Sequence, residues 1–256
     1  MSIHPLKKEI HRSATLIKDA SHCIVLSGAG ISTASGIPDF RSAGSGLWTH
    51  HHPMDVASLT IFRHHPERFF EWLRPLVKNI LQAKPNPAHL ALAKLEKKGF
   101  IKTIITQNID GLHQRAGSKK TLEIHGTLNT LSCIGCYKKY DSESYFSPYI
   151  EHGEIPHCPA CGRILKPDAV LFEEQLPISV WLAAKKAAET CDLMLITGSS
   201  LAVMPVAGLP VKASQNGAKI IIINQSPTYI DEQADYVIKG DVADIMPFFA
   251  DQILND

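Results

Sequence analysis

Four of the six cysteines are spaced as metal ligands. Cys133 and Cys136 form one C-x-x-C pair, and Cys158 and Cys161 form a second pair after 21 intervening residues. Each pair can direct two thiolates at one ion, and two pairs complete a tetrahedral zinc site. Four cysteine ligands leave no open coordination position, so the ion would be structural. A redox-active dithiol or cysteines without a metal role are the alternatives.

Histidines add weaker candidates for metal binding. His157 stands next to Cys158 and could compete as a ligand, although four cysteines make it unnecessary. The runs His50–His52 and His64–His65 contain neighbouring histidines, whose side chains point in different directions along a chain. We therefore interpret these runs as solvated loops.

A glycine-rich segment follows the apolar stretch 23–26, which is typical of a buried strand. Gly28-Ala29-Gly30-Ile31-Ser32 after a strand favours a loop that brings backbone N–H groups to a phosphate, although many such loops are ordinary tight turns. The third glycine of the dehydrogenase pattern G-x-G-x-x-G is replaced by Thr33. No acidic residue follows about twenty positions later in a plausible second strand. The loop thus indicates a dinucleotide without hydride transfer.

The residues after this loop also carry side chains that could take part in binding or chemistry. Pro38, Asp39, Phe40 and Arg41 place a rigid turn, a carboxylate, a ring and a cation beside the presumed phosphate site. A surface loop without a function would rarely group these four residue types.

Polar residues follow several other apolar stretches that we interpret as strands. Open α/β sheets bind ligands at the carboxyl ends of their strands. The stretches 101–106, 122–124, 193–197 and 219–223 lead respectively into Gln107-Asn108-Ile109-Asp110, His125-Gly126, Gly198-Ser199-Ser200 and Asn224.

Helical patterns separate these strands, at 5–20, 88–98, 180–189 and 203–216. The alternation predicts an α/β fold with a parallel sheet covered on both faces. Two segments interrupt it: an aromatic helical insert at 43–84 and the cysteine module at 130–166. We expect these two to form a smaller domain, with the sheet domain comprising 1–42, 85–129 and 167–256.

Composition narrows the class of protein. The 256 residues include 26 Lys and Arg against 25 Asp and Glu, a net charge of +1 that gives no reason to expect direct nucleic-acid or membrane-surface binding. The first ten residues lack the apolar core of a signal peptide, and no run has the length of a membrane span. The C-x-x-C pairs suit a reducing compartment, so we expect a soluble cytoplasmic protein, with Cys23 and Cys191 as core thiols. The oligomeric state is not evident from the sequence.

Taken together, these motifs resemble the sirtuin family of NAD-dependent protein deacylases. The resemblance rests on the glycine loop, Gly36-Ile37-Pro38-Asp39-Phe40-Arg41, Thr106-Gln107-Asn108-Ile109-Asp110, His125-Gly126, the four cysteines, Gly198-Ser199-Ser200-Leu201 and Ile223-Asn224, in family order. It extends from about residue 10 to residue 250.

The resemblance implies a Rossmann-like sheet domain and a small zinc domain, with NAD and an acylated lysine meeting between them. It also implies a mechanism: the acyl oxygen attacks C1′ of the nicotinamide ribose, nicotinamide leaves and an alkylimidate forms. His125 would then be the general base on a ribose hydroxyl, a role that suits a neutral imidazole. Asn108 and Asp110 would line the nicotinamide pocket and complete the catalytic set.

Further NAD contacts are implied for residues that match the family motifs: Gly28, Ala29, Gly30, Ser32, Asp39, Phe40, Arg41, Gln107, Ile109, Gly198, Ser199, Ser200, Asn224 and Val242. The segment 166–172 is similar to the strand that pairs with the substrate backbone. The acetylated peptide would therefore contact Val170, Leu171 and Phe172 as well as His125.

Three departures from the family pattern stand out. Glu173 replaces a frequent glycine, and it could favour basic peptides or point into solvent. Ser226 stands where many members have Glu. Leu73 and Leu76 align with the Tyr and Arg of members that remove succinyl groups, which favours acetyl or a longer apolar acyl group here.

Two other functions share these motifs. A mono-ADP-ribosyltransferase would use the same attack at C1′, and a catalytically silent module would bind NAD and zinc only. His125 favours deacylation over the first, and retention of Asn108 and Asp110 argues against the second.

Overall fold

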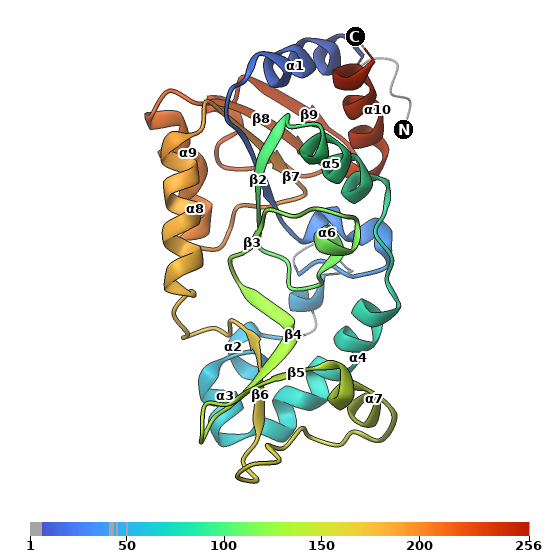
Figure 1. The fold of residues 1–256 in the computed structure, drawn as a ribbon, viewed down its shortest axis with the longest axis vertical. Coiled ribbons are helices and arrows are strands. Elements are labelled where there is room, and N and C mark those ends of the chain that lie inside the picture. The colour runs from blue at the N-terminus through green and yellow to red at the C-terminus, as the bar shows by residue number, and fades with distance from the viewer. Residues whose placement is uncertain (1–6, 41–43, 45, 50, 256) are drawn as a thin grey trace.

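A six-stranded parallel sheet forms the centre of the fold (Figure 1). The computed structural model describes residues 7–40, 44, 46–49 and 51–255. The strand order is β3-β2-β1-β7-β8-β9. The strands are β1 Cys23–Ser27, β2 Ile101–Thr106, β3 Thr121–Glu123, β7 Leu193–Thr197, β8 Lys219–Asn224 and β9 Tyr236–Lys239. The predicted parallel α/β sheet is confirmed.

Helices cover both faces of this sheet (Figure 1). Along β1, Val25 contributes to the apolar cluster of one face, while Ile24 and Leu26 contribute to that of the other. Such alternation is the two-residue period of a strand buried on both sides. The first face carries α1 Lys7–Asp19, α5 Pro87–Lys97 and α10 Val242–Leu254, and the second carries α8 Ile178–Thr190 and α9 Leu209–Gln215.

Short helical segments complete the connections: α6 Leu112–Arg115 and the single turns Ala29–Ile31, Thr33–Ser35, Leu47–Thr49, Val206–Gly208 and Asp231–Gln233. In the described part of the chain, no helix is both long enough and apolar enough to cross a membrane.

A second group of elements packs below the sheet in the view of Figure 1. It combines helices α2 Pro53–Val56, α3 Leu59–His64, α4 Pro66–Gln82 and α7 Glu143–His152 with strands β4 Gly126–Cys133, β5 Lys139–Asp141 and β6 Leu165–Ala169. These strands form an antiparallel sheet of order β5-β4-β6. Phe62 and Phe69 of the insert share one apolar cluster with Leu131 and Tyr149. The helical character of the insert is confirmed. The expected module limits 130 and 166 fall inside β4 and β6, and the proposed domain division stays a prediction.

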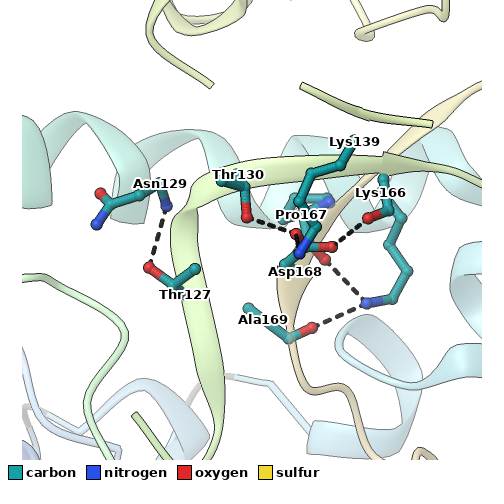
Figure 2. Close-up of polar contacts among 9 residues, drawn as sticks. Thr127, Asn129, Thr130, Lys139, Lys166, Pro167, Asp168 and Ala169 are labelled. Atoms are coloured by element: carbon teal, nitrogen blue, oxygen red, sulfur yellow. Dashed lines mark hydrogen bonds and ion pairs between the residues drawn. The ribbon is translucent and has the colours of Figure 1, made fainter. Parts of the chain in front are cut away.

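Asp168 ties the three strands of the small sheet together (Figure 2). Its carboxylate accepts hydrogen bonds from Thr130 and from Ser132 Oγ at 2.6 Å on β4, and it pairs with Lys139 Nζ at 3.0 Å on β5. Burial raises the pKa of Asp168, but the hydrogen bonds from Ser132 and Thr130 lower it, and the net pKa lies below the usual value for Asp. The carboxylate is therefore held in its charged form.

The loops that follow β1 and β7 lie in direct contact. Gly30 N donates to Gly198 O at 2.8 Å, and Gly28 N donates to Thr197 O at 3.2 Å. A Cβ added to Gly30 would stand 2.8 Å from Gly198 O, inside van der Waals contact with backbone. Gly28 and Gly30 are thus required by loop packing. Their own N–H groups are already bonded to β7 and its loop. The phosphate contact expected of this loop would therefore have to come from groups other than the N–H groups of Gly28 and Gly30.

We predict that Gly30→Ala lowers the free energy of unfolding by about 1–3 kcal/mol, the usual cost of forcing extra atoms into a packed site. Gly208→Ala is the matched control, because its new Cβ would lie 3.7 Å from a flexible methionine methyl group. Urea unfolding measures both variants, and equal stability of the two would contradict the packing argument.

Candidate functional site

The strand ends of the parallel sheet converge on one cavity. Because all six strands run in parallel, the residues after β1, β2, β3, β7 and β8 meet at the same edge. β1 lies between β2 and β7, so strands β2 and β3 lie on one side of β1 and strands β7, β8 and β9 lie on the other. A cavity of about 1090 Å³ opens there.

The sequence-predicted binding residues line this cavity almost without exception. Arg41 lies outside the described residues. The others in the wall are Gly28, Ala29, Gly30, Ser32, Asp39, Phe40, Gln107, Asn108, Ile109, Asp110, His125, Val170, Leu171, Phe172, Gly198, Ser199, Ser200, Asn224 and Val242.

A buried polar network joins the glycine loop to the end of β2. Ser32 Oγ donates to Asp110 Oδ2 at 2.7 Å, and Asn108 Nδ2 donates to Ser32 Oγ and Gly28 O, both at 3.1 Å. Asp110 Oδ1 also accepts from Leu112 N at 2.9 Å. Burial raises the pKa of Asp110 against the opposing effect of these hydrogen bonds. The network holds both buried side chains in place in the cavity wall.

His125 lies in the turn between β3 and β4. Its Nδ1 lies 3.1 Å from Gln107 O. A carbonyl oxygen only accepts, so this contact places the hydrogen on Nδ1 and makes Nε2 the basic nitrogen of the neutral ring. Gln107 is held in turn, because its Nε2 donates to Ser199 Oγ at 2.9 Å. The imidazole is therefore oriented through the loops of β2 and β7.

Residues at the ends of β7 and β8 form another part of the cavity wall. Asn224 Nδ2 donates to Ser199 O at 3.1 Å and to Ser226 O at 2.8 Å. Ser226 thus contributes its backbone carbonyl to this end of the site. Val242 begins α10, whose N-cap Asp241 accepts from Ala243 N at 2.8 Å.

An aromatic group in the wall was missed by sequence reasoning. Trp48 stacks on Phe40 with ring centroids 5.1 Å apart and on Trp72 at 5.7 Å. Its edge approaches Phe172 at 6.0 Å. Trp48 therefore connects the segment that follows the glycine loop, helix α4 and the predicted peptide segment. The available signal was a large aromatic residue in a glycine-rich stretch directly after Phe40.

Leu73 and Leu76 of α4 lie in the apolar part of the cavity wall. Ile80, one turn after Leu76, extends this apolar surface. Neither Leu73 nor Leu76 offers a charge to a ligand, as the sequence alignment predicts.

Glu173 is exposed to solvent, which is one of the two alternatives expected from the sequence, and it also bonds to the protein. Its Oε2 accepts from Thr60 N at 2.8 Å in the first turn of α3, and this backbone hydrogen bond lowers its pKa. The backbone of Glu173 is left-handed, with φ +73°, the conformation that glycine adopts most easily. The side chain therefore bonds to the helical insert.

The four predicted metal ligands meet at one point. Their Sγ atoms all lie within 4.8 Å of one another, with Cys133 and Cys161 at 3.4 Å and Cys136 and Cys158 at 3.6 Å. A tetrahedral zinc with Zn–S bonds of about 2.3 Å separates its sulfurs by roughly 3.8 Å, so the cluster fits that ion. Tyr140 Oη lies 3.2 Å from Cys158 Sγ.

The histidine candidates that the structure describes lie outside the metal-ligand cluster. Among the described residues, the four cysteines are the only cluster of this kind. His157 is exposed and its Nδ1 lies 2.7 Å from Ile155 O. His51, His52, His64 and His65 are exposed, and His50 lies outside the described residues.

A buried histidine pair lies behind the site. The rings of His89 and His113 are 5.0 Å apart, and His113 Nε2 lies 2.9 Å from Ser27 Oγ at the end of β1. Burial lowers the pKa of His89 to about 3 and that of His113 to about 4. Both rings are therefore neutral near pH 7.

Comparison with known proteins gives one consistent family. The model of the Sir2 family matches residues 28–205. "NAD-dependent protein deacylase 2" of Archaeoglobus fulgidus is 42% identical over 97% of this chain and 97% of its own length. A solved structure described as "Structural Basis for the Mechanism and Regulation of Sir2 Enzymes" has 41% identity and a TM-score of 0.91, covering 97% of this chain and 99% of the other. Another, "Sir2-p53 peptide-NAD+", has 37% identity and a TM-score of 0.84, covering 100% and 98%.

We predict that Cys158→Ala loses bound zinc and melts at a lower temperature, because three thiolates leave the tetrahedral site incomplete. Cys191→Ala removes a buried thiol outside the cluster and should retain about one zinc per chain. Elemental analysis and thermal melting test this pair. A Cys158→Ala protein with a full complement of zinc would contradict a structural site.

The histidine pair predicts acid sensitivity. The pKa values of both residues lie below the unfolded value of about 6.5, so the unfolded state binds more protons. Stability is then full above pH 6.5 and falls by about 1 kcal/mol per histidine between pH 6.5 and 5.5. Urea unfolding at both pH values should show a smaller fall in His113→Gln. His64→Gln, at an exposed position, should match wild type, and equal falls in all three proteins would oppose the assignment.

Proposed function

We propose, because the chain belongs to the Sir2 family, that it is an NAD-dependent protein lysine deacetylase that forms nicotinamide and O-acetyl-ADP-ribose. One observation carries the proposal. His125, the Asn108–Asp110 segment, the glycine loop and the segment 170–172 line a single cavity at the sheet edge. A nucleotide and an extended acyl-peptide can therefore meet beside one basic imidazole.

NAD, when bound, supplies an electrophilic ribose carbon with nicotinamide as its leaving group. We assign the nicotinamide end to Asn108 and Asp110, which Ser32 holds through the buried network. The phosphates and riboses would lie along the loops after β1 and β7, with Ser199 and Asn224 nearby. The remaining nucleotide contacts that we assign are Gly28, Ala29, Gly30, Asp39, Arg41, Gln107, Ile109, Gly198, Ser200 and Val242.

His125 would act as general base through Nε2. The Gln107 carbonyl keeps the hydrogen on Nδ1, so Nε2 can take a proton from a ribose hydroxyl that faces it. Phe40, stacked on Trp48, would cover the reacting region and limit the access of water. Zinc bound by the four cysteines would have no open coordination position, so it would take no part in these steps.

The acyl-lysine peptide would bind along Val170, Leu171 and Phe172, with its acyl chain toward Leu73 and Leu76. Neither Leu73 nor Leu76 offers a cation to an acidic acyl group, which favours acetyl or a longer apolar acyl group over succinyl. The partners we propose are therefore acetyl-lysine proteins. We further propose a cytoplasmic location, supported by six free cysteines, four of which form a cluster suited to zinc.

The test is mass spectrometry of acetyl-, succinyl- and myristoyl-lysine peptides incubated with the protein, with and without NAD. We expect NAD-dependent loss of acetyl together with nicotinamide and O-acetyl-ADP-ribose, and no loss of succinyl. Transfer of ADP-ribose to protein with the peptide still acetylated would establish a mono-ADP-ribosyltransferase. Binding of NAD with no turnover of any peptide would establish a silent module.

His125→Ala should lower kcat for deacetylation by about 10²-fold or more, in the range of general-base catalysis. NAD affinity should change little, because the imidazole acts on a hydroxyl and the nucleotide has other contacts. His152→Ala changes an exposed histidine at the end of α7 and should keep wild-type turnover. Full activity of His125→Ala would exclude this residue as the base.

A further inference from the structure

Glu173 and Glu174 directly follow the predicted peptide segment 170–172, and each bonds to a different neighbouring element. Glu173 Oε2 accepts from Thr60 N at 2.8 Å, on the side of the helical insert. Glu174 Oε2 pairs with Lys166 Nζ at 2.9 Å, on the side of β6. The same Glu174 oxygen accepts from Leu171 N at 2.8 Å, inside the segment itself.

The insert side forms a continuous set of main-chain contacts. Phe172 N donates to Ala57 O, and Leu59 N donates to Phe172 O, both at 3.0 Å. Glu173 adds the next amide, Thr60 N, and Ser58 Oγ accepts the following one, Ile61 N, at 3.2 Å. Each of the first three amides of α3 thus has an acceptor, and two of these acceptors belong to residues 172 and 173.

On the β6 side, Lys166 bonds both to the backbone of β6 and to Glu174. Lys166 Nζ donates to Pro167 O and Ala169 O, both at 2.9 Å, so its ammonium wraps the end of β6 (Figure 2). The Lys166 and Glu174 side chains are only 14% and 22% exposed, which weakens screening by solvent. This pair is therefore a stronger restraint than a surface ion pair.

The segment between these restraints also touches the base. Val170 N donates to His125 O at 2.8 Å. Any shift of residues 170–172 would therefore change their position relative to the imidazole that the proposed reaction uses.

We propose that Glu173 and Glu174 are opposed positioning residues, which preorganise the segment 170–172 for an extended acyl-lysine peptide by bonding it to α3 and to Lys166. The proposal rests on the proposed function for its substrate, and on the contacts above for its geometry. It also explains the non-glycine residue at φ +73°: the carboxylate contact offsets the strained backbone.

Positioning predicts a specific kinetic pattern. Loss of a hydrogen bond to a charged acceptor should raise the peptide KM about tenfold in Glu174→Ala, and by a smaller factor in Glu173→Ala, whose carboxylate is exposed to solvent. The KM for NAD should stay within about twofold, since neither carboxylate bonds to the loops of β1, β2 or β7. Glu173→Gln keeps a carbonyl acceptor for Thr60 N and should restore most of the peptide KM. Glu154→Ala, at an exposed glutamate of the same half of the molecule, is the matched control.

Amide hydrogen exchange without substrate tests the geometry independently of activity. Exchange at Thr60 should accelerate in Glu173→Ala, and exchange at Leu171 in Glu174→Ala, while β7 amides keep wild-type rates. Glu173→Gly should match Glu173→Ala at Thr60 yet melt at a higher temperature, because glycine relieves the left-handed backbone.

The outcomes separate the two proposals. Unchanged exchange at Thr60 and Leu171, or a raised exchange with an unchanged peptide KM, would overturn the positioning role. Absence of turnover in wild type would instead refute the proposed function, and the exchange rates would still decide whether the glutamates hold the segment.

Discussion

The contact between the loops after β1 and β7 is the constraint on which the site depends. These loops approach so closely that a Cβ at Gly28 or Gly30 would meet backbone of Gly198 or Ser199. The contact brings Gly28 O within reach of Asn108 and the Ser199 hydroxyl within reach of Gln107. Gln107 then orients His125. One close backbone approach thereby fixes polar groups on three strand ends.

The small sheet extends this order toward the segment 170–172, which we propose binds the substrate. Asp168 joins β4, β5 and β6 on one side, and the cysteine cluster joins the ends of β4 and the loop before β6. The segment 170–172 continues directly from β6 and bonds to His125. None of the four cysteines lines the cavity, so a zinc ion in the cluster would act by holding the strands from which this segment emerges.

Much of the fold and site was predictable because the signals were local. Apolar runs such as 193–197 gave strands with the same limits as the structure, and polar residues at their ends located the cavity. β4 escaped prediction, since its burial mixes exposed and buried residues without clean alternation. Trp48 and the His89–His113 pair also escaped, because their environments arise from residues distant in sequence. Glu173 shows the same limit: its partner Thr60 is 113 residues away.

The apolar cluster of the small half couples two separate stretches of the chain. Phe62 and Phe69 come from the stretch between β1 and β2, whereas Leu131 and Tyr149 come from the stretch that carries the cysteines. Residues in one core are close enough for their substitutions to interact. The side chains accepted in one stretch therefore depend on those present in the other.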